Sequence, residues 1–328
     1  MFLKGTYLKT LGIASIFTLG IGVGGHCASA KESGTVNEKW GKPVFAYGAS
    51  LSSEQKKETQ KLLDISDLDS VKSVSVSGQD LVKYLKDGSP ESNLYSSAKV
   101  ERTDSGSGIN VEIIKPENIT KVTESMYKNA TITAGVTDAN ITIASPIRVT
   151  GESALTGIYK AYDSEGEKLD NKRMDIANDE LETISGISDD NKNINGEQIT
   201  QALAEIKKEM AENKPATKED VQKIVEDELK KADLNQVITQ EQTTQLINLA
   251  DKYRTNDINF DEAKKQLDDL AKESQKKAKE LFDQGAKKYK DLKDSGFFEN
   301  LFSAIGDFFK GLADIIGGFF GWVGEQFA

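Results

Sequence analysis

Residues 131–162 read TITAGVTDANITIASPIRVTGESALTGIYKAY, and their pattern indicates the fold class. Within it, residues 140–145 alternate polar and apolar side chains, as a half-buried strand does. After Gly151 the apolar residues of 154–161 recur at helical spacing. A strand followed by a helix, with further short elements of both kinds before it, predicts a small mixed α+β domain over residues 44–187.

The sequence ahead of this stretch supplies those further elements. The β-type runs are 71–76, 98–102 and 109–114. The expected helices cover 54–63, behind an N-cap at Ser52 or Ser53, a segment after Ser77, and 119–129.

Beyond residue 187 the composition shifts to Lys, Glu, Asp, Gln and Ala, which predicts helices. Two of them begin at capping boxes, Thr217 with Asp220 and Thr239 with Gln242. The expected segments are a helical region over 188–255, a charged helix over 256–295 and a C-terminal amphipathic, apolar tail over 296–328.

Three stretches of this sequence resemble one family. They are residues 131–162 quoted above, YGASLSSEQ at 47–55 and TQEQTTQLINLADKY at 239–253. The chain thus resembles the YpuA-like family of secreted proteins from Gram-positive bacteria, a domain of unknown function. The sequence departs from the family at Ser50, where the family favours aspartate. The resemblance implies an exported α+β domain followed by helices, and it brings no known activity.

Residues 1–30 have the three zones of a secretory signal peptide. Two lysines give a positive start, residues 11–25 carry no charge, and Ala28-Ser29-Ala30 offers small residues for cleavage. The alternative is an uncleaved N-terminal anchor, although the apolar stretch is short for a membrane span. We therefore expect a flexible mature N-terminus over 31–43. The mature protein is expected to be secreted, either extracellular or peripheral on the outer face of the cell membrane.

Cleavage after Ala30 would limit the chemistry of the mature protein. The chain has one histidine, His26, and one cysteine, Cys27, and both would be removed. Catalysis by Ser-His-Asp or Cys-His groups, zinc sites built on His or Cys, haem ligation and disulfides are then excluded. We expect no cofactor.

The charge of the chain argues against one class of partner. It has 42 basic and 53 acidic residues, and the signal peptide contains two of the lysines and no acid. The mature chain therefore has 40 basic residues against 53 acidic ones, a net charge of −13. Since such a protein repels polyanions, we expect no nucleic-acid partner.

A weak calcium alternative lies between two expected helices. Asp251, Asp257, Asn259 and Glu262 occupy positions one, seven, nine and twelve of an EF-hand loop. Positions three and five hold Tyr253 and Thr255 instead of oxygen-rich ligands. The competing interpretation is a turn in which these acids and amides cap the next helix, and we expect no metal site.

A carboxylate-dependent hydrolase of cell-envelope polymer is the alternative function. Two Asp or Glu side chains in one cleft can hydrolyse a glycoside without histidine. Among the 53 acidic residues, however, no pair stands out by spacing. The two tryptophans, Trp40 and Trp322, lie near the two ends of the mature chain. We predict no catalytic residue, and the sequence favours a non-enzymatic protein.

The strongest sequence signal is the amphipathic pattern of the C-terminal tail. Its apolar residues recur at steps of three and four, with a second row beside them, and form one broad stripe in a helix. They are Phe298, Leu301, Phe302, Ile305, Phe308, Phe309, Leu312, Ile315, Ile316, Phe319 and Trp322. The longest run without charge, residues 315–324, is about half of what a bilayer needs.

Three interpretations of this stripe remain open: packing on the protein's own domain, insertion into a membrane interface, or self-association. The charged helix before the tail separates it from the other domains, which argues against the first. The leading hypothesis is a secreted, non-enzymatic protein whose tail binds a membrane surface or another copy of itself.

Overall fold

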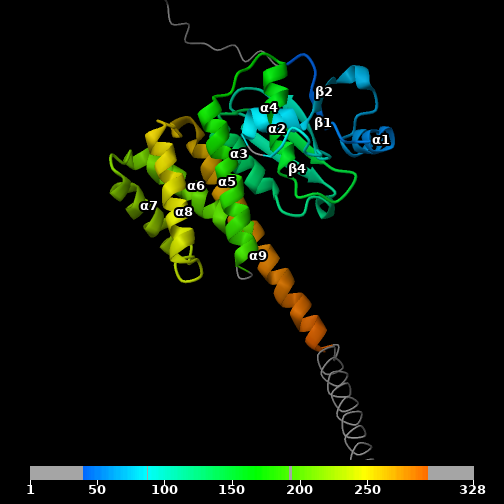
Figure 1. Ribbon diagram of the computed structural model, residues 1–328. Helices are drawn as coiled ribbons and strands as arrows, with labels where there is room; N and C mark the ends of the chain where they lie inside the picture. The colour runs from blue at the N-terminus through cyan, green and yellow to red at the C-terminus, as the bar shows by residue number, and fades with distance from the viewer. Residues whose placement is uncertain (1–39, 87, 192–193, 295–328) are drawn as a thin grey trace, which may run out of the picture. The chain divides into compact units, whose positions relative to one another are not determined.

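The strands of this α+β protein form one five-stranded mixed sheet (Figure 1). A computed structural model describes residues 40–86, 88–191 and 194–294, with the side chains of the last helix up to residue 284 and at 287. The strand order is β2-β1-β3-β5-β4. The strands are β1 (Val44–Gly48), β2 (Lys72–Val76), β3 (Ser97–Arg102), β4 (Ile109–Ile114) and β5 (Ala139–Ala144).

The pairing directions follow from the connections between strands. β3 runs antiparallel to both β1 and β5, while the outer strands β2 and β4 run parallel to their neighbours. Each parallel pair is joined by a crossover that contains a helix. These helices are α1 (Ser53–Leu62) between β1 and β2, and α3 (Glu124–Ala134) between β4 and β5.

Helices cover one face of the sheet. α3 packs on β4, and α4 (Ser153–Ser164) packs across β1, β2 and β3. On the opposite face, the segment after α1 covers only the region of Phe45, around which Leu63, Ile65 and Val71 pack. The rest of that face carries exposed side chains, among them Ser73, Glu112 and Asn140. Since successive side chains of a strand point to opposite faces of the sheet, Phe45 lies on this face and Ala46 on the helix-covered face. Both side chains are fully buried.

Further helices complete the described part of the chain. They are α2 (Gly78–Leu85), α5 (Asn171–Asp190), α6 (Gly196–Asn213), α7 (Lys218–Lys231), α8 (Gln240–Thr255) and α9 (Lys264–Asp294). Short 3-10 turns cover Leu68–Ser70, Pro116–Asn118 and Asp261–Ala263. One hydrophobic core runs from the sheet through these helices, from Val44 to Ala271.

Helix starts agree with several expectations. Ser52 is the N-cap of α1, and the capping boxes at Thr217 and Thr239 begin α7 and α8 as predicted. The expected helix over 119–129 is wrong at both ends. Ile119 forms a parallel bridge with Val149 instead, and α3 starts only where the Thr123 hydroxyl accepts a hydrogen bond from the Met126 amide.

Candidate functional site

The residues predicted for the tail lie outside the described part of the chain. All of them, from Phe298 to Trp322, fall in residues 295–328, and the segment predicted as a signal peptide, with His26 and Cys27, falls in residues 1–39. The structure therefore gives no contact for any of these side chains.

Two of the four side chains of the calcium alternative, those of Asp251 and Asn259, have other partners in the structure. The Asp251 carboxylate accepts hydrogen bonds from the Arg254 guanidinium at 2.8 Å. The Asn259 side chain accepts one from the Asp261 amide at 2.7 Å, at the 3-10 turn before α9. Across residues 40–86, 88–191 and 194–294, no three or more His, Cys, Asp or Glu side chains are grouped for a metal ion.

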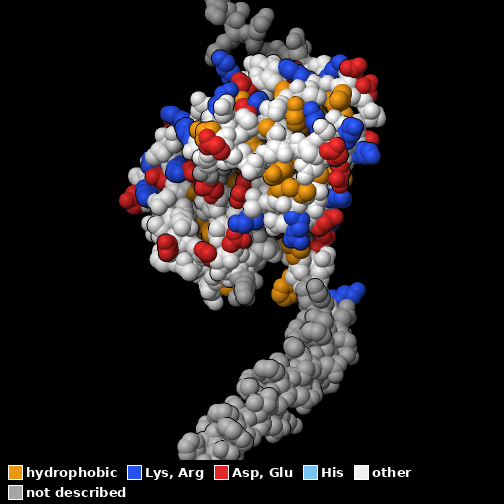
Figure 2. Space-filling model, turned by 45° about the vertical axis from the view of Figure 1, so that its right-hand side comes forward, with side chains coloured by type: hydrophobic (Ala, Val, Ile, Leu, Met, Phe, Trp, Pro, Cys, Tyr) orange, Lys and Arg blue, Asp and Glu red, His pale blue; other side chains and the backbone are white. Residues whose placement is uncertain are grey.

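The helix that precedes the tail changes environment along its length. The first half of α9 packs against α6 and buries Leu267, Leu270 and Ala271. From residue 279 to residue 284 every side chain is exposed, with Leu281 at 50% and Phe282 at 75%. Figure 2 shows hydrophobic side chains at the end of the described part of this helix. α9 thus leaves the core after its first four turns.

Two ion pairs join α9 to α3. Lys128 of α3 lies 2.9 Å from Glu273, and Lys277 lies 2.8 Å from Glu124. In the described part of the chain, no helix has the length and apolar character needed to cross a membrane.

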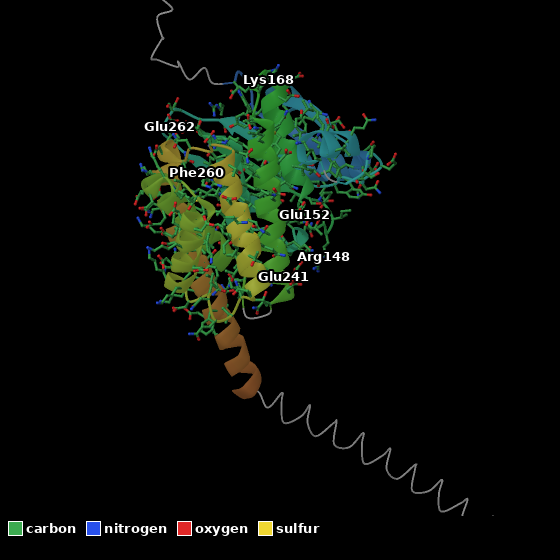
Figure 3. All side chains as sticks on the ribbon, turned by 60° about the vertical axis from the view of Figure 1, so that its left-hand side comes forward. Arg148, Glu152, Lys168, Glu241, Phe260 and Glu262 are labelled. Carbon is green, nitrogen blue, oxygen red and sulfur yellow. The ribbon has the colours of Figure 1, made fainter. Side chains whose placement is uncertain are left out.

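A cavity of about 480 Å³, here named cavity A, is lined in part by α5. In Figure 3, Glu152 of this cavity lies on one side of the molecule and Glu262 on the other. Its walls come from α2, the loop before β3, the loop before α4 and α5. The lining residues are Leu81, Leu85, Ser92–Tyr95, Val149–Ser153, Asn178 and Glu182.

The loop before α4 is built around Gly151. Its φ of +107° suits glycine, and a Cβ there would lie 2.6 Å from Ile119 and 2.8 Å from the Tyr127 hydroxyl. Tyr127 donates a hydrogen bond to the Gly151 carbonyl from the buried core. This anchoring fixes Glu152 and Ser153 at the mouth of cavity A, at the start of α4.

The α5 wall of cavity A is polar. Asn178, which is 7% exposed, donates a hydrogen bond to the Glu182 carboxylate one turn later at 2.7 Å. Glu152 accepts one from the Thr150 hydroxyl at 3.1 Å. Tyr95 is the aromatic residue among the described lining residues, none of which is lysine or arginine. Two carboxylates and one aromatic ring therefore share this cavity.

A second, shallower cavity of about 640 Å³, cavity B, continues along α5. It shares Leu85, Asn178 and Glu182 with cavity A, so the two adjoin. Four of its charged side chains form two ion pairs. Lys86 pairs with Asp175 of α5, and Lys252 of α8 lies 2.5 Å from Asp179. We refer to cavities A and B together as the trough.

A fully buried ion pair lies on the core side of α5. Lys207 of α6 and Glu180 of α5 are both 0% exposed and 2.9 Å apart. The Glu180 carboxylate also accepts from Asn129, Thr133 and Tyr253 at 2.7 to 2.9 Å. Burial raises the pKa of Glu180 and lowers that of Lys207. The four converging donors are nevertheless what an ionised carboxylate accepts, so the pair is charged.

The trough was missed by sequence reasoning because its walls are far apart in the chain. Leu85, Glu152 and Glu182 come from three separate elements, and only the fold brings them together. One local signal was available: Asn178 and Glu182 are four residues apart, and such residues share one face of a helix.

Comparisons with known proteins place the chain in context. A family model described as "Protein of unknown function (DUF1002)" matches residues 47–270. The "Uncharacterized protein YpuA" of Bacillus subtilis (strain 168) is 36% identical over 235 residues, which cover 70% of this chain and 77% of that protein. No solved structure matches.

Proposed function

Because this chain belongs to the DUF1002 family of proteins of unknown function, we propose a function from its own residues. It is a secreted, non-enzymatic protein, and its C-terminal amphipathic segment binds the membrane interface at the outer face of the cell. The trough-bearing domain is thereby held at that surface.

The observation that supports this proposal is the course of α9. Its first half is part of the core, but Leu281 and Phe282 are exposed on a helix that continues to Asp294. In Figure 1 the last described turns of α9 extend past the other helices. A helix that carries apolar side chains into solvent leads toward the amphipathic sequence of residues 296–328.

Apolar burial would have to drive this binding. Residues 298–328 contain four acids and one lysine, a net charge of −3, so anionic lipid does not attract them. Each Phe, Leu or Ile side chain that leaves water contributes about 1.5 to 3 kcal/mol, and the stripe contains ten of them besides Trp322. Aromatic residues also favour the interfacial region of a bilayer.

Substitution of two stripe residues tests the proposal. The secreted protein, whose N-terminus mass spectrometry should find at Lys31, should float with phosphatidylcholine vesicles in a density gradient, also at 1 M salt, which screens charge. Phe308→Asp with Ile315→Asp should abolish flotation, because each introduces a charge where the stripe is buried. The matched control is Ser303→Asp with Lys310→Asp, which adds negative charge on the polar side and should still float.

Three outcomes would overturn membrane binding. Wild-type protein that stays out of the vesicle fraction and forms oligomers, as measured by light scattering, would favour self-association through the stripe. Deletion of residues 296–328 that unfolds the rest of the protein would show that the tail packs on its own domain. Flotation of the Phe308→Asp, Ile315→Asp variant would locate binding elsewhere.

A carboxylate-dependent hydrolase of cell-envelope polymer is the second candidate. The observation that favours it is the pair Glu152 and Glu182 in one cavity with Tyr95. Incubation of purified cell-wall polysaccharide with the protein would then release reducing ends. Glu152→Gln or Glu182→Gln should reduce that rate at least 100-fold, the usual range for loss of an acid or base catalyst. Glu241→Gln, on the exposed first turn of α8, should leave it unchanged.

A further inference from the structure

We propose that Lys207 of α6 and Asn129 of α3 form an amide cross-link in the folded protein, with Glu180 of α5 as the acid–base group and one ammonia as the leaving group. The inference is independent of the membrane proposal, because it concerns the buried core. The reaction occurs once in each molecule and has no external substrate, so it is also independent of the hydrolase candidate.

The three side chains form a closed set of hydrogen bonds. Lys207 Nζ donates to Asn129 Oδ1 at 2.8 Å and to Glu180 Oε2 at 2.9 Å. The Asn129 amide nitrogen, Nδ2, donates to the same Glu180 oxygen at 2.9 Å. One carboxylate oxygen therefore contacts both the nitrogen that attacks and the nitrogen that leaves. This is the position that a group needs in order to carry a proton from one to the other.

The two atoms that would bond are already close. Because a C=O bond is about 1.23 Å long, the carbonyl carbon of Asn129 lies within about 4 Å of Lys207 Nζ, whose distance to Oδ1 is 2.8 Å. A shift of about 1 Å or less at the end of the lysine side chain reaches the roughly 3 to 3.5 Å of a productive attack.

The surroundings of these groups exclude water. Asn129, Glu180 and Lys207 are each 0% exposed. The buried rings of Tyr253 and Phe260 each lie 5.6 Å from Lys207 Nζ. Since water does not reach the Asn129 amide, the lysine nitrogen is the nucleophile placed against it, and hydrolysis of the amide does not compete.

The proton balance of the buried pair favours the reactive form. Burial lowers the pKa of Lys207 and raises that of Glu180. Both shifts ease transfer of a proton from the ammonium group to the carboxylate, and the resulting neutral amine can attack. Thr133 and Tyr253 donate to Glu180 Oε1 at 2.7 Å each, which leaves Oε2 to carry the proton.

The reaction balances without any further reagent. The neutral Nζ of Lys207 bonds to Cγ of Asn129, and the electron pair of the carbonyl π bond moves to Oδ1. Glu180 then gives its proton to Nδ2 and takes one from Nζ. The Cγ–Nδ2 bond breaks, the carbonyl re-forms, and ammonia leaves. The products are a neutral amide and a protonated Glu180, so two buried charges are replaced by neutral groups and their desolvation cost is removed.

The cross-link joins the sheet to the helices that follow it. Asn129 lies in the crossover helix α3, and Lys207 lies in α6, 78 residues later. A cross-link restricts the unfolded chain, and the stabilisation grows with the length of the loop that it closes. The only cysteine of the chain is Cys27. A disulfide therefore cannot supply this constraint within residues 40–294.

Mass spectrometry of the folded full-length protein tests the proposal. After incubation at neutral pH, the intact protein should be lighter by one ammonia than its sequence from the observed N-terminus requires. Trypsin does not cleave after an acylated lysine, so a digest should contain one branched peptide that joins residues 129–148 to residues 193–208. A succinimide at Asn195-Gly196 would also lose ammonia, but it would leave these two peptides separate.

Three single variants should keep the full mass: Lys207→Met, Asn129→Ala and Glu180→Gln. Lys208→Met is the matched control on the same helix, and it should still lose one ammonia. Circular dichroism melting of each variant separates a lost reaction from lost folding. The intact mass also identifies unreacted wild-type protein, with which the stability of the ion-pair variants is to be compared.

Folded wild-type protein that keeps its full mass would overturn the proposal, whether or not the variants fold. Loss of water instead of ammonia, with Lys207 joined to Glu180, would show that Asn129 is not the acceptor. A Glu180→Gln variant that still forms the branched peptide would remove Glu180 from the reaction.

Discussion

Replacing Lys207 with methionine should lower the free energy of unfolding by about 3 to 5 kcal/mol. The ammonium group donates to Glu180 at 2.9 Å, Asn129 at 2.8 Å and Thr133 at 2.6 Å, all within the core. Methionine fills a similar volume, but it leaves the Glu180 carboxylate buried without its counter-charge. Urea denaturation followed by circular dichroism measures the change.

Position 208 offers the matched control on the same helix. Lys208 also makes ion pairs, with Glu205 and Asp268, but it is partly exposed, so Lys208→Met should cost at most about 1 kcal/mol. Adding Glu180→Gln to Lys207→Met should restore most of the loss, because a neutral amide still accepts from Thr133 and Tyr253. A cost below about 1 kcal/mol for Lys207→Met would contradict a charged pair.

The loss of stability in Lys207→Met should depend on pH. Burial raises the folded-state pKa of Glu180 above its ordinary value of 4.5, and removal of Lys207 takes away the charge that lowers it. A raised folded pKa contributes stability that is fully present below the unfolded pKa and is lost as the pH rises through the folded pKa. The deficit of Lys207→Met relative to the wild type should therefore be smaller at pH 5 than at pH 8.

Replacing Gly48 with alanine should cost about 3 kcal/mol or more, at the upper end for overpacking. The new Cβ would lie 2.2 Å from the Leu94 carbonyl oxygen and 2.9 Å from the Tyr95 Cα. Both are backbone atoms, so no side chain can rotate to relieve the contact. Thermal melting measures the change.

Gly186→Ala is the control for Gly48→Ala. Gly186 lies inside α5, and outside the nearby backbone of its own helix no heavy atom lies within 4 Å of a Cβ added there. Alanine there should raise stability by about 0.5 to 1 kcal/mol, since it lowers the chain entropy lost on folding. If Gly48→Ala were as mild as Gly186→Ala, the close approach of β1 to the Leu94 segment would be wrong.

The α+β class and most helix starts could be predicted because their signals are local. At Thr217 and Thr239, the N-cap hydroxyl accepts a hydrogen bond from the backbone amide three residues later, and the side chain of that later residue accepts one from the N-cap amide. Such a capping box needs no distant partner. α5 was not predicted, because the pattern of its buried residues depends on distant parts of the chain. It packs against α2, α3, α6 and α8, so its buried residues, including the polar Asn178 and Glu180, do not form a single apolar stripe.

The candidate site could not be predicted by the same means. An acidic pair in one cavity is a property of the packing, and nothing in the spacing of Glu152 and Glu182 along the chain indicates it. The Lys207–Glu180 pair could not be predicted either. In the sequence, two charged residues on different helices look like ordinary surface residues, and only the packing of the helices buries them together. The predictions for the tail and the signal peptide stay predictions, since residues 295–328 and 1–39 lie outside the described part.

The part of α9 that extends beyond the core sets both a distance from the domain and a rotation about the helix axis. From Lys277 at the last ion pair to Asp294 the helix advances about 25 Å, and each residue turns the chain by about 100°. Insertion of one residue after Phe282 would barely change the reach of α9. It would, however, rotate the domain about the axis of α9 by about 100°, more than a quarter turn, relative to the helix after the insertion. The orientation of the trough about the axis of α9 therefore depends on the number of residues in the exposed part of that helix.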